Sequence, residues 1–489
     1  MNLRRAHTDF FIVLAVLLPL AFCGAAVNRL FVLGLVAVAF FYISNPVFGL
    51  YLLVPFVCVH TVYPLPQLPL LGYSDVFLHE AVIAFFLLLG LAKRAMHRTQ
   101  GDPMLWRWYW RLVLLTLPSL YVGLKSTVWH NLCFRNYMTV LFVGATLMPQ
   151  VLRGSSFVHF YRFFLFCLAA FLVARFGLTV WRVAQLGTLL RNPFYGSATM
   201  LMLVPLLVVS VPFIVQGKGR LFTRACLAVV LAAIAVLAFL SGGRGSSLAL
   251  FLAVGITWLA LARDGAALFG RILFLLLIAV TAIWVMATLD MPIVKRFLSG
   301  YANVFSMGDK PNLGDTATWR IAMYKDAINS WLKHPLLGVG WGGTIRGTHG
   351  YRFFAVYIGS ENLTDIPQHV HNAFLGILAG GGLVGAAGFV LFVRYCASES
   401  RRGLAALPVE QRRPLRAVIV GAVSSFTMLL STNALVAAPQ IALFFLFIGI
   451  WLRFLRLDPA ERAYVIARFR WLPDTAKNEA GSPPAEARQ

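Results

Sequence analysis

The stretch HNAFLGILAGGGLVGAAGFVLFV, residues 371–393, decides the fold class of this chain. It contains no Asp, Glu, Lys or Arg along its whole length. A helix of about 20 apolar residues crosses the ~30 Å hydrocarbon core of a bilayer. The stretch is therefore predicted to be a membrane span, and the chain a membrane protein.

Apolar runs of similar character extend on both sides of this stretch. About eleven lie between Phe10 and Leu289, and two more follow at 416–433 and 438–453. Of the 489 residues, 60% are hydrophobic and 12% are charged, whereas soluble domains carry about 25% charged residues. We predict an all-α polytopic membrane protein with about 12–14 transmembrane helices and one large, partly helical periplasmic loop.

Changes in polarity divide the chain into four parts. Residues 1–289 are predicted to form about eleven transmembrane helices, and 290–370 a large loop of mixed polarity. Residues 371–456 are predicted to form three C-terminal transmembrane helices, and 457–489 a tail that begins with a surface helix. Spanning segments need only be apolar, so we expect the specific chemistry to lie in and around the loop.

Within the loop, Thr316–Lys333 is predicted to be a helix that ends at His334-Pro335. Trp319, Met323, Ala327 and Trp331 recur at about four residues, which gives the helix one apolar face. Because Trp prefers the lipid headgroup region, we expect this face at the membrane boundary. The Gly-rich run after the helix, Gly338–Gly343, resembles GxGxxG, but no strand precedes it, so a tight turn is favoured over a dinucleotide site.

The formal net charge of +24 would suit a nucleic-acid-binding protein, but the basic residues gather in alternate loops. The cluster Arg401, Arg402, Arg412, Arg413 and Arg416 is the largest of these. By the positive-inside rule, we expect both termini in the cytoplasm and the 290–370 loop on the outer side of the membrane. We expect membrane lipids and no nucleic acid as partners.

His371 and Arg320 are candidates for catalysis. His371 stands where the loop re-enters the bilayer, and imidazole titrates near ambient pH, so it can take a proton from an acceptor hydroxyl. Arg320 lies in the loop helix, and guanidinium matches two phosphate oxygens of a diphosphate at once. The alternatives are an interfacial anchor for His371 and a solvated or headgroup-binding side chain for Arg320.

Five further residues complete the candidate site. Arg244 lies in the small-residue turn Ser241–Ser247, where its guanidinium and open backbone N–H groups can meet an anion. The candidate substrate-binding residues are Arg191, Arg346, His369 and Asn372. A metal pair of His369 or His371 with His349 lacks acidic or thiol partners, and the six cysteines form no CxxC pair. We expect no metal and no cofactor.

Three segments together resemble the bacterial O-antigen ligase and O-antigen polymerase superfamily. The first, Ser241–Ser246, is similar to the family's small-Arg-Gly turn. The second, Thr318–Gly340, is similar to its Arg-containing loop helix and the ending "hPllGvG". The third, His371–Gly385, is similar to "HNxFLxxLxExGxxG", except that Gly380 replaces the usual acid. Glu361 and Asp365 are the obvious stand-ins for that acid.

The resemblance implies a metal-independent glycosyltransferase on the outer face of the inner membrane. Such enzymes move a glycan from an undecaprenyl diphosphate carrier to an acceptor hydroxyl, in O-antigen, lipopolysaccharide or exopolysaccharide assembly. Arg244 and Arg320 would hold the diphosphate, and His371 would activate the acceptor.

Three functions remain open at this point. A polymerase would join carrier-linked repeat units, and a ligase would transfer finished polymer to a lipid A core or a protein. The length of the chain inclines us slightly toward the polymerase, since ligases of the superfamily tend to be shorter. An exporter of lipid-linked sugar would need polar residues in many spans, and these spans are too apolar for that.

Overall fold

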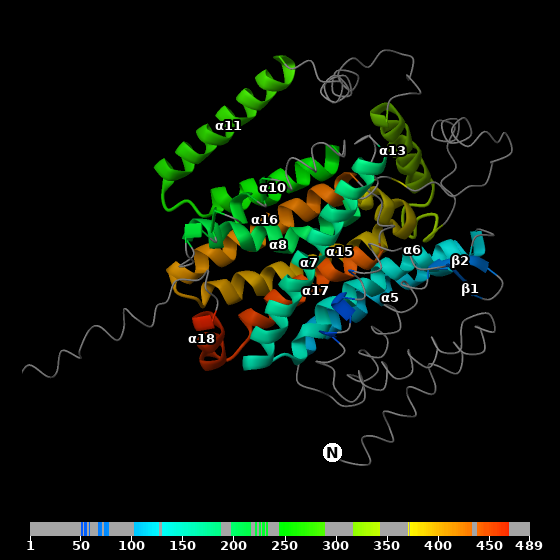
Figure 1. Ribbon diagram of the computed structural model, residues 1–489. Coiled ribbons are helices and arrows are strands. Elements are labelled where there is room, and N and C mark those ends of the chain that lie inside the picture. Colours follow the sequence, from blue (N-terminus) through cyan, green and yellow to red (C-terminus); the bar gives the residue numbers. More distant parts are fainter. Residues whose placement is uncertain are drawn as a thin grey trace, which may run out of the picture.

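The protein is a bundle of helices, seen in the computed structural model (Figure 1). The structure describes residues 67–70, 73–77, 102–126, 130–186, 197–216, 244–288, 316–342, 370, 372–432 and 438–468, and 50–58 and 221–232 in part. Among these residues, Gly154–Ala174, Ala373–Ala405 and Val409–Leu430 are long and apolar enough to cross a membrane. Four shorter apolar helices accompany them. The predicted class, an all-α membrane protein, is confirmed.

The bounds of the elements follow in chain order. They are β1 (Gln67–Leu70), β2 (Tyr73–Phe77), α5 (Pro103–Ser126), α6 (His130–Phe142), the 3-10 helix η1 (Val143–Val151), α7 (Gly154–Leu186), α8 (Ser197–Gln216), α10 (Arg244–Ala260), α11 (Gly265–Thr288), α13 (Thr316–Lys333), α15 (Ala373–Ala405), α16 (Val409–Thr432), α17 (Ala438–Leu455) and α18 (Pro459–Arg468). The strands β1 and β2 pair antiparallel, which was not predicted.

Close packing of side chains holds the bundle together. Helix α10 packs along α16, α17 packs along η1, and α15 packs along α5. The rings of Phe426 and Phe444 stack with centroids 3.9 Å apart, and Ser425 donates a hydrogen bond of 2.9 Å to Ala249 O. Lipid tails are as apolar as Leu, so such contacts, and not exclusion of water, drive helix association inside a membrane.

At one end of the bundle, α5 begins with a local capping arrangement. Asp102 accepts hydrogen bonds from the backbone N–H groups of Met104 (2.9 Å) and Leu105 (2.8 Å), and Pro103 follows it in the first helical position. An acidic cap satisfies free N–H groups and favours the positive end of the helix dipole, while Pro there loses no hydrogen bond. The sequence Asp-Pro thus fixes the start of α5.

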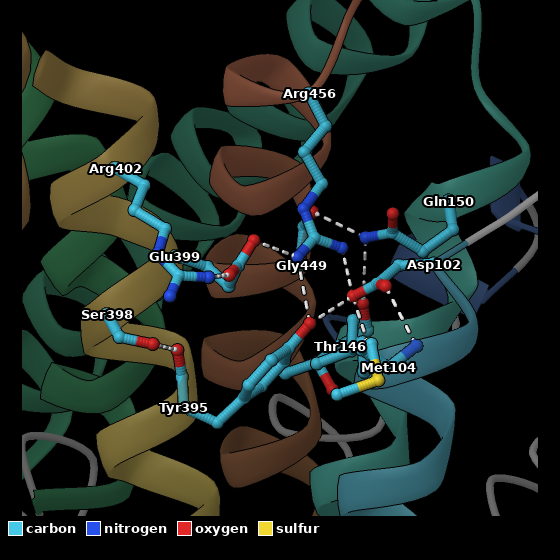
Figure 2. A network of polar contacts seen from close by, with 11 residues as sticks. Asp102, Met104, Thr146, Gln150, Tyr395, Ser398, Glu399, Arg402, Gly449 and Arg456 are labelled. Atoms are coloured by element: carbon cyan, nitrogen blue, oxygen red, sulfur yellow. Dashed lines mark hydrogen bonds and ion pairs between the residues drawn. The ribbon is translucent and has the colours of Figure 1, made fainter. Parts of the chain in front are cut away.

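The same carboxylate belongs to a network of charged side chains, which Figure 2 shows. Arg456, just after α17, forms ion pairs with Asp102 and with Glu399 of α15. Tyr395 of α15 donates a hydrogen bond to Asp102 and accepts one of 2.8 Å from Arg456. Burial raises the pKa of Asp102, but the hydrogen bonds from Tyr395 and Arg456 and the charge of Arg456 outweigh it, so the pKa lies below its usual value. The network ties α5, α15 and the end of α17 together.

Helices α5 and α15 connect this network with the opposite end of the bundle. A helix of 33 residues, the length of α15, extends about 50 Å when straight. The loop helix α13 lies at the end of the bundle far from α18 (Figure 1). It packs against α15 there, so α15 carries the ion-pair network at one end and the loop helix at the other.

Candidate active site

The segment after the loop helix completes the hydrogen bonds of a broken helix. Helix α15 contains one residue with non-helical dihedral angles, Gly382, at φ 61° and ψ −166°. Beyond it, Leu383 N and Val384 N donate to Pro335 O (2.9 Å) and Leu336 O (3.1 Å), which belong to the loop. Backbone groups buried in a membrane need partners, and the loop supplies them where the helix cannot.

The α5 helix holds the same segment from its other side. Val339 N donates to Ala379 O (2.8 Å), and Trp341 N donates to Ser119 O (3.2 Å). Ser119 Oγ in turn donates to Gly381 O (3.0 Å), and Ser126 Oγ donates to Val339 O (3.2 Å). The predicted tight turn is therefore a stretch of backbone inserted between α5 and α15. The "hPllGvG" ending of the loop helix has a structural role in this chain.

Replacing Gly382 by alanine is expected to destabilise the protein by about 2–4 kcal/mol. The dihedral angles of Gly382 lie in a region that only glycine adopts readily, and an added Cβ would overlap Leu336 O. Thermal unfolding in detergent measures the effect. Gly376→Ala is the matched control, because a Cβ at Gly376 on the same helix meets nothing within 4 Å. Equal melting temperatures for the two variants would show that the break in α15 does not require glycine at position 382.

Two residues of the predicted apolar face of α13, Met323 and Ala327, lie against protein. Met323 is 3% exposed and Ala327 is 1% exposed. Ala327 forms a small apolar cluster with Val370 and Ala379. Apolar periodicity identifies a buried face without saying whether lipid or protein covers it. Trp331 is half-buried and the side chain of Trp319 lies outside the described part, so the headgroup contact of the two indoles stays a prediction.

Arg320 lies one turn from Tyr324 on the side of α13 that meets α15. Its side chain is half-buried, and its Nε is buried with no hydrogen-bond partner among the described residues. A buried guanidinium nitrogen without a partner is costly, which favours a site for an anionic ligand.

Tyr324 connects Arg320 with the start of α15. Its side chain hydrogen-bonds with the side chain of Asn372 and lies close enough to Arg320 to feel its charge. Burial raises the pKa of Tyr324, and the charge of Arg320 and the hydrogen bond from Asn372 only partly offset this. The phenol therefore stays neutral, and the sequence analysis did not single it out.

Asn372 caps α15. Its Oδ1 accepts hydrogen bonds from Phe374 N (3.0 Å) and Leu375 N (3.1 Å), and its backbone is extended at φ −155° and ψ 112°. The N-terminus of a helix carries a partial positive charge. Arg320 and the start of α15 thus gather positive charge at one place, which suits a diphosphate.

The other predicted site residues are described less fully or not at all. Arg244 is the first residue of α10, and its side chain lies outside the described part. Outside the described residues lie Arg191, Arg346, His369, His371, and the two acidic stand-ins Glu361 and Asp365. In the described part, Tyr324 interacts both with Arg320 and with Asn372, the sequence neighbour of His371, and the roles of all the site residues stay predictions.

Position 380, where the family has an acid, is closely packed. A Cβ at Gly380 would lie 3.5 Å from Gly340 O and 3.9 Å from Trp341 Cα. Trp341 is 3% exposed and packs between Tyr137 and Phe389. A buried carboxylate that the sequence analysis did not consider, Asp326, is 4% exposed in α13. Among the described residues, no three His, Cys, Asp or Glu side chains are grouped to hold a metal ion.

A comparison with known families covers the part of the chain that holds these candidate residues. Residues 227–390 match the family model described as O-antigen ligase. The matched segment contains α10, α13 and the first half of α15, and with them Arg244, Arg320, Asn372 and His371. No curated protein is similar enough to the whole chain to count as a match. Residues 227–390, about a third of the chain, are thus similar to the O-antigen ligase family, in agreement with the resemblance noted in the sequence.

Proposed function

We propose that this protein is a glycosyltransferase that moves a glycan from undecaprenyl diphosphate to an acceptor hydroxyl on the periplasmic face of the inner membrane. The proposal depends on one observation about Arg320. Its Nε is buried and has no hydrogen-bond partner among the described residues. Its helix packs against α15, whose start follows His371 in the chain. In this proposal both termini lie in the cytoplasm, and the 290–370 loop covers the site from the periplasm.

The reaction breaks one bond and forms another at the anomeric carbon of the glycan. The bond from that carbon to the carrier phosphate breaks, and undecaprenyl diphosphate leaves with the electron pair. The acceptor oxygen forms the new glycosidic bond, and its proton passes to His371. Arg320 and Arg244 offset the charge that develops on the leaving diphosphate, so that neither a metal ion nor a cofactor is needed.

The remaining candidate residues take supporting roles in this proposal. Arg191, Arg346 and His369 would contact the diphosphate or the glycan. Asn372 already uses its carbonyl oxygen to cap α15, so its contribution comes from its position and not from that oxygen.

Two acceptors are compatible with this chemistry. In a polymerase, the acceptor hydroxyl belongs to another carrier-linked repeat unit, and the length of the chain favours this choice. In a ligase, it belongs to a lipid A core or a protein. The match to the family model agrees with both candidates and does not choose between them.

The glycans of a deletion strain test the function and choose between the acceptors. Loss of a polymerase is expected to leave lipid A core capped with a single repeat unit, because transfer to the core continues. Loss of a ligase would leave long polymer on the carrier and bare core. Gel electrophoresis of lipopolysaccharide, with mass spectrometry of carrier-linked glycans, separates these results. Unchanged glycans in the deletion strain would overturn the proposal.

A further inference from the structure

Two side chains connect the loop helix to the start of α15, and only one of them was a predicted site residue. Tyr324 of α13 lies one turn after Arg320, and Asn372 comes directly before α15. The α13 and α15 helices pack together, with Tyr324 against the cluster of Ala327, Val370 and Ala379. The phenol ring is therefore held by apolar contacts, and its hydroxyl is directed to the cap of α15.

Asn372 has both ends of its carboxamide in use. Its Oδ1 accepts from Phe374 N at 3.0 Å and from Leu375 N at 3.1 Å, which fixes the side chain against the helix. The amide NH₂ is the donor that remains, and the side chain of Asn372 hydrogen-bonds with Tyr324. Ser and Asp cap helices as well as Asn does, but neither offers an amide donor to a tyrosine.

We infer that Tyr324 is a positioning residue, which through Asn372 sets the guanidinium of Arg320 at a fixed place relative to residue 371. The inference rests on the proposed function, since it assigns no chemistry of its own to Tyr324. Arg320 and Tyr324 share one face of a rigid helix, so fixing the phenol also fixes the guanidinium. Asn372 and His371 are adjacent in the chain, so fixing the cap limits where the backbone of residue 371 can lie.

A positioning role has consequences that differ from those of a binding role. If the hydroxyl only aligns two groups for the transition state, its removal lowers kcat and leaves KM for the lipid-linked donor nearly unchanged. If it only stabilised the fold, its removal would lower the melting temperature and the yield of folded protein. The contact joins two side chains, so removing either one should have the same effect as removing both.

The experiment measures glycan transfer by the full-length protein in proteoliposomes, with carrier-linked glycan from the deletion strain as donor. Tyr324→Phe and Asn372→Ser are each expected to lower kcat about tenfold, with KM and melting temperature unchanged. The double variant is expected to be no slower than either single variant. Asn372→Ser keeps an oxygen to cap α15, so the loss reports on the amide and not on the cap. Tyr121→Phe, on an exposed tyrosine of α5, is the matched control.

Several results would overturn the inference. One is full activity of Tyr324→Phe. Another is a double variant whose loss is the product of the two single losses. A third is a change seen only in KM or only in the melting temperature. Arg320→Ala in the same assay tests the proposed function separately from the positioning role of Tyr324. An inactive Arg320→Ala beside a fully active Tyr324→Phe rejects only the positioning role, whereas full activity of Arg320→Ala rejects the diphosphate site itself.

Discussion

Replacement of Arg320 by alanine is expected to lower glycan transfer about 100- to 1,000-fold while leaving the protein folded and inserted. The expected size is that of removing one group that stabilises charge developing in a transition state. The Nε of Arg320 is buried without a hydrogen-bond partner among the described residues, so at least this nitrogen is free to bind a ligand. Transfer rates in proteoliposomes, with the melting temperature alongside, measure the effect.

Two further variants show what the guanidinium does. Arg320→Lys keeps the charge but loses the planar fork, and we expect it to recover only a small part of the activity. Lys325→Ala removes an exposed cation from the same helix and is expected to be fully active. Arg244→Ala and His371→Ala should be as inactive as Arg320→Ala. Full activity in all three alanine variants would refute the assignment of the site.

Replacement of Arg456 by alanine is expected to destabilise the protein by about 3 kcal/mol. It would leave the carboxylates of Asp102 and Glu399, which are 9% and 17% exposed, without the cation that pairs with both. Removing one partner of a buried ion pair costs far more than the pair contributes, because the other charge stays desolvated. Thermal unfolding in detergent provides the measurement.

Arg402→Ala is the control for this prediction. Arg402 also pairs with Glu399, at 3.0 Å, but its side chain is 79% exposed. An exposed pair contributes only about 0.2–1 kcal/mol, so the control should unfold at nearly the wild-type temperature. Neutralising both acids, with Asp102→Asn and Glu399→Gln in the Arg456→Ala background, should restore much of the loss. If Arg456→Ala and Arg402→Ala unfold alike, the network does not stabilise the bundle.

The helices themselves could be predicted from the sequence. The loop helix was predicted at Thr316–Lys333, and α13 has the same bounds. Its apolar positions recur with the helical period, and Pro335 ends it, so local information was sufficient. The surface helix expected after Leu457 is α18, Pro459–Arg468.

What the sequence did not reveal depends on contacts between distant residues. The break in α15 at Gly382 has its hydrogen-bond partners in Pro335 and Leu336, and no local pattern pairs them. Tyr324 looked like one more apolar residue of an amphipathic helix. Its spacing of four from Arg320 was a usable signal, since both then lie on one face.

The backbone hydrogen bonds between α15 and the loop also imply an order of assembly during translation. Residues 335–341 leave the ribosome before α15 is made, yet their carbonyls and amides pair with α15 at Ala379, Leu383 and Val384. Until α15 lies beside α5, the groups of Pro335, Leu336 and Val339 that pair with α15 lack these partners, although α5 can already bind Val339 and Trp341. A chain that stalls before residue 384 is therefore expected to insert its earlier helices without placing residues 335–339 against α15.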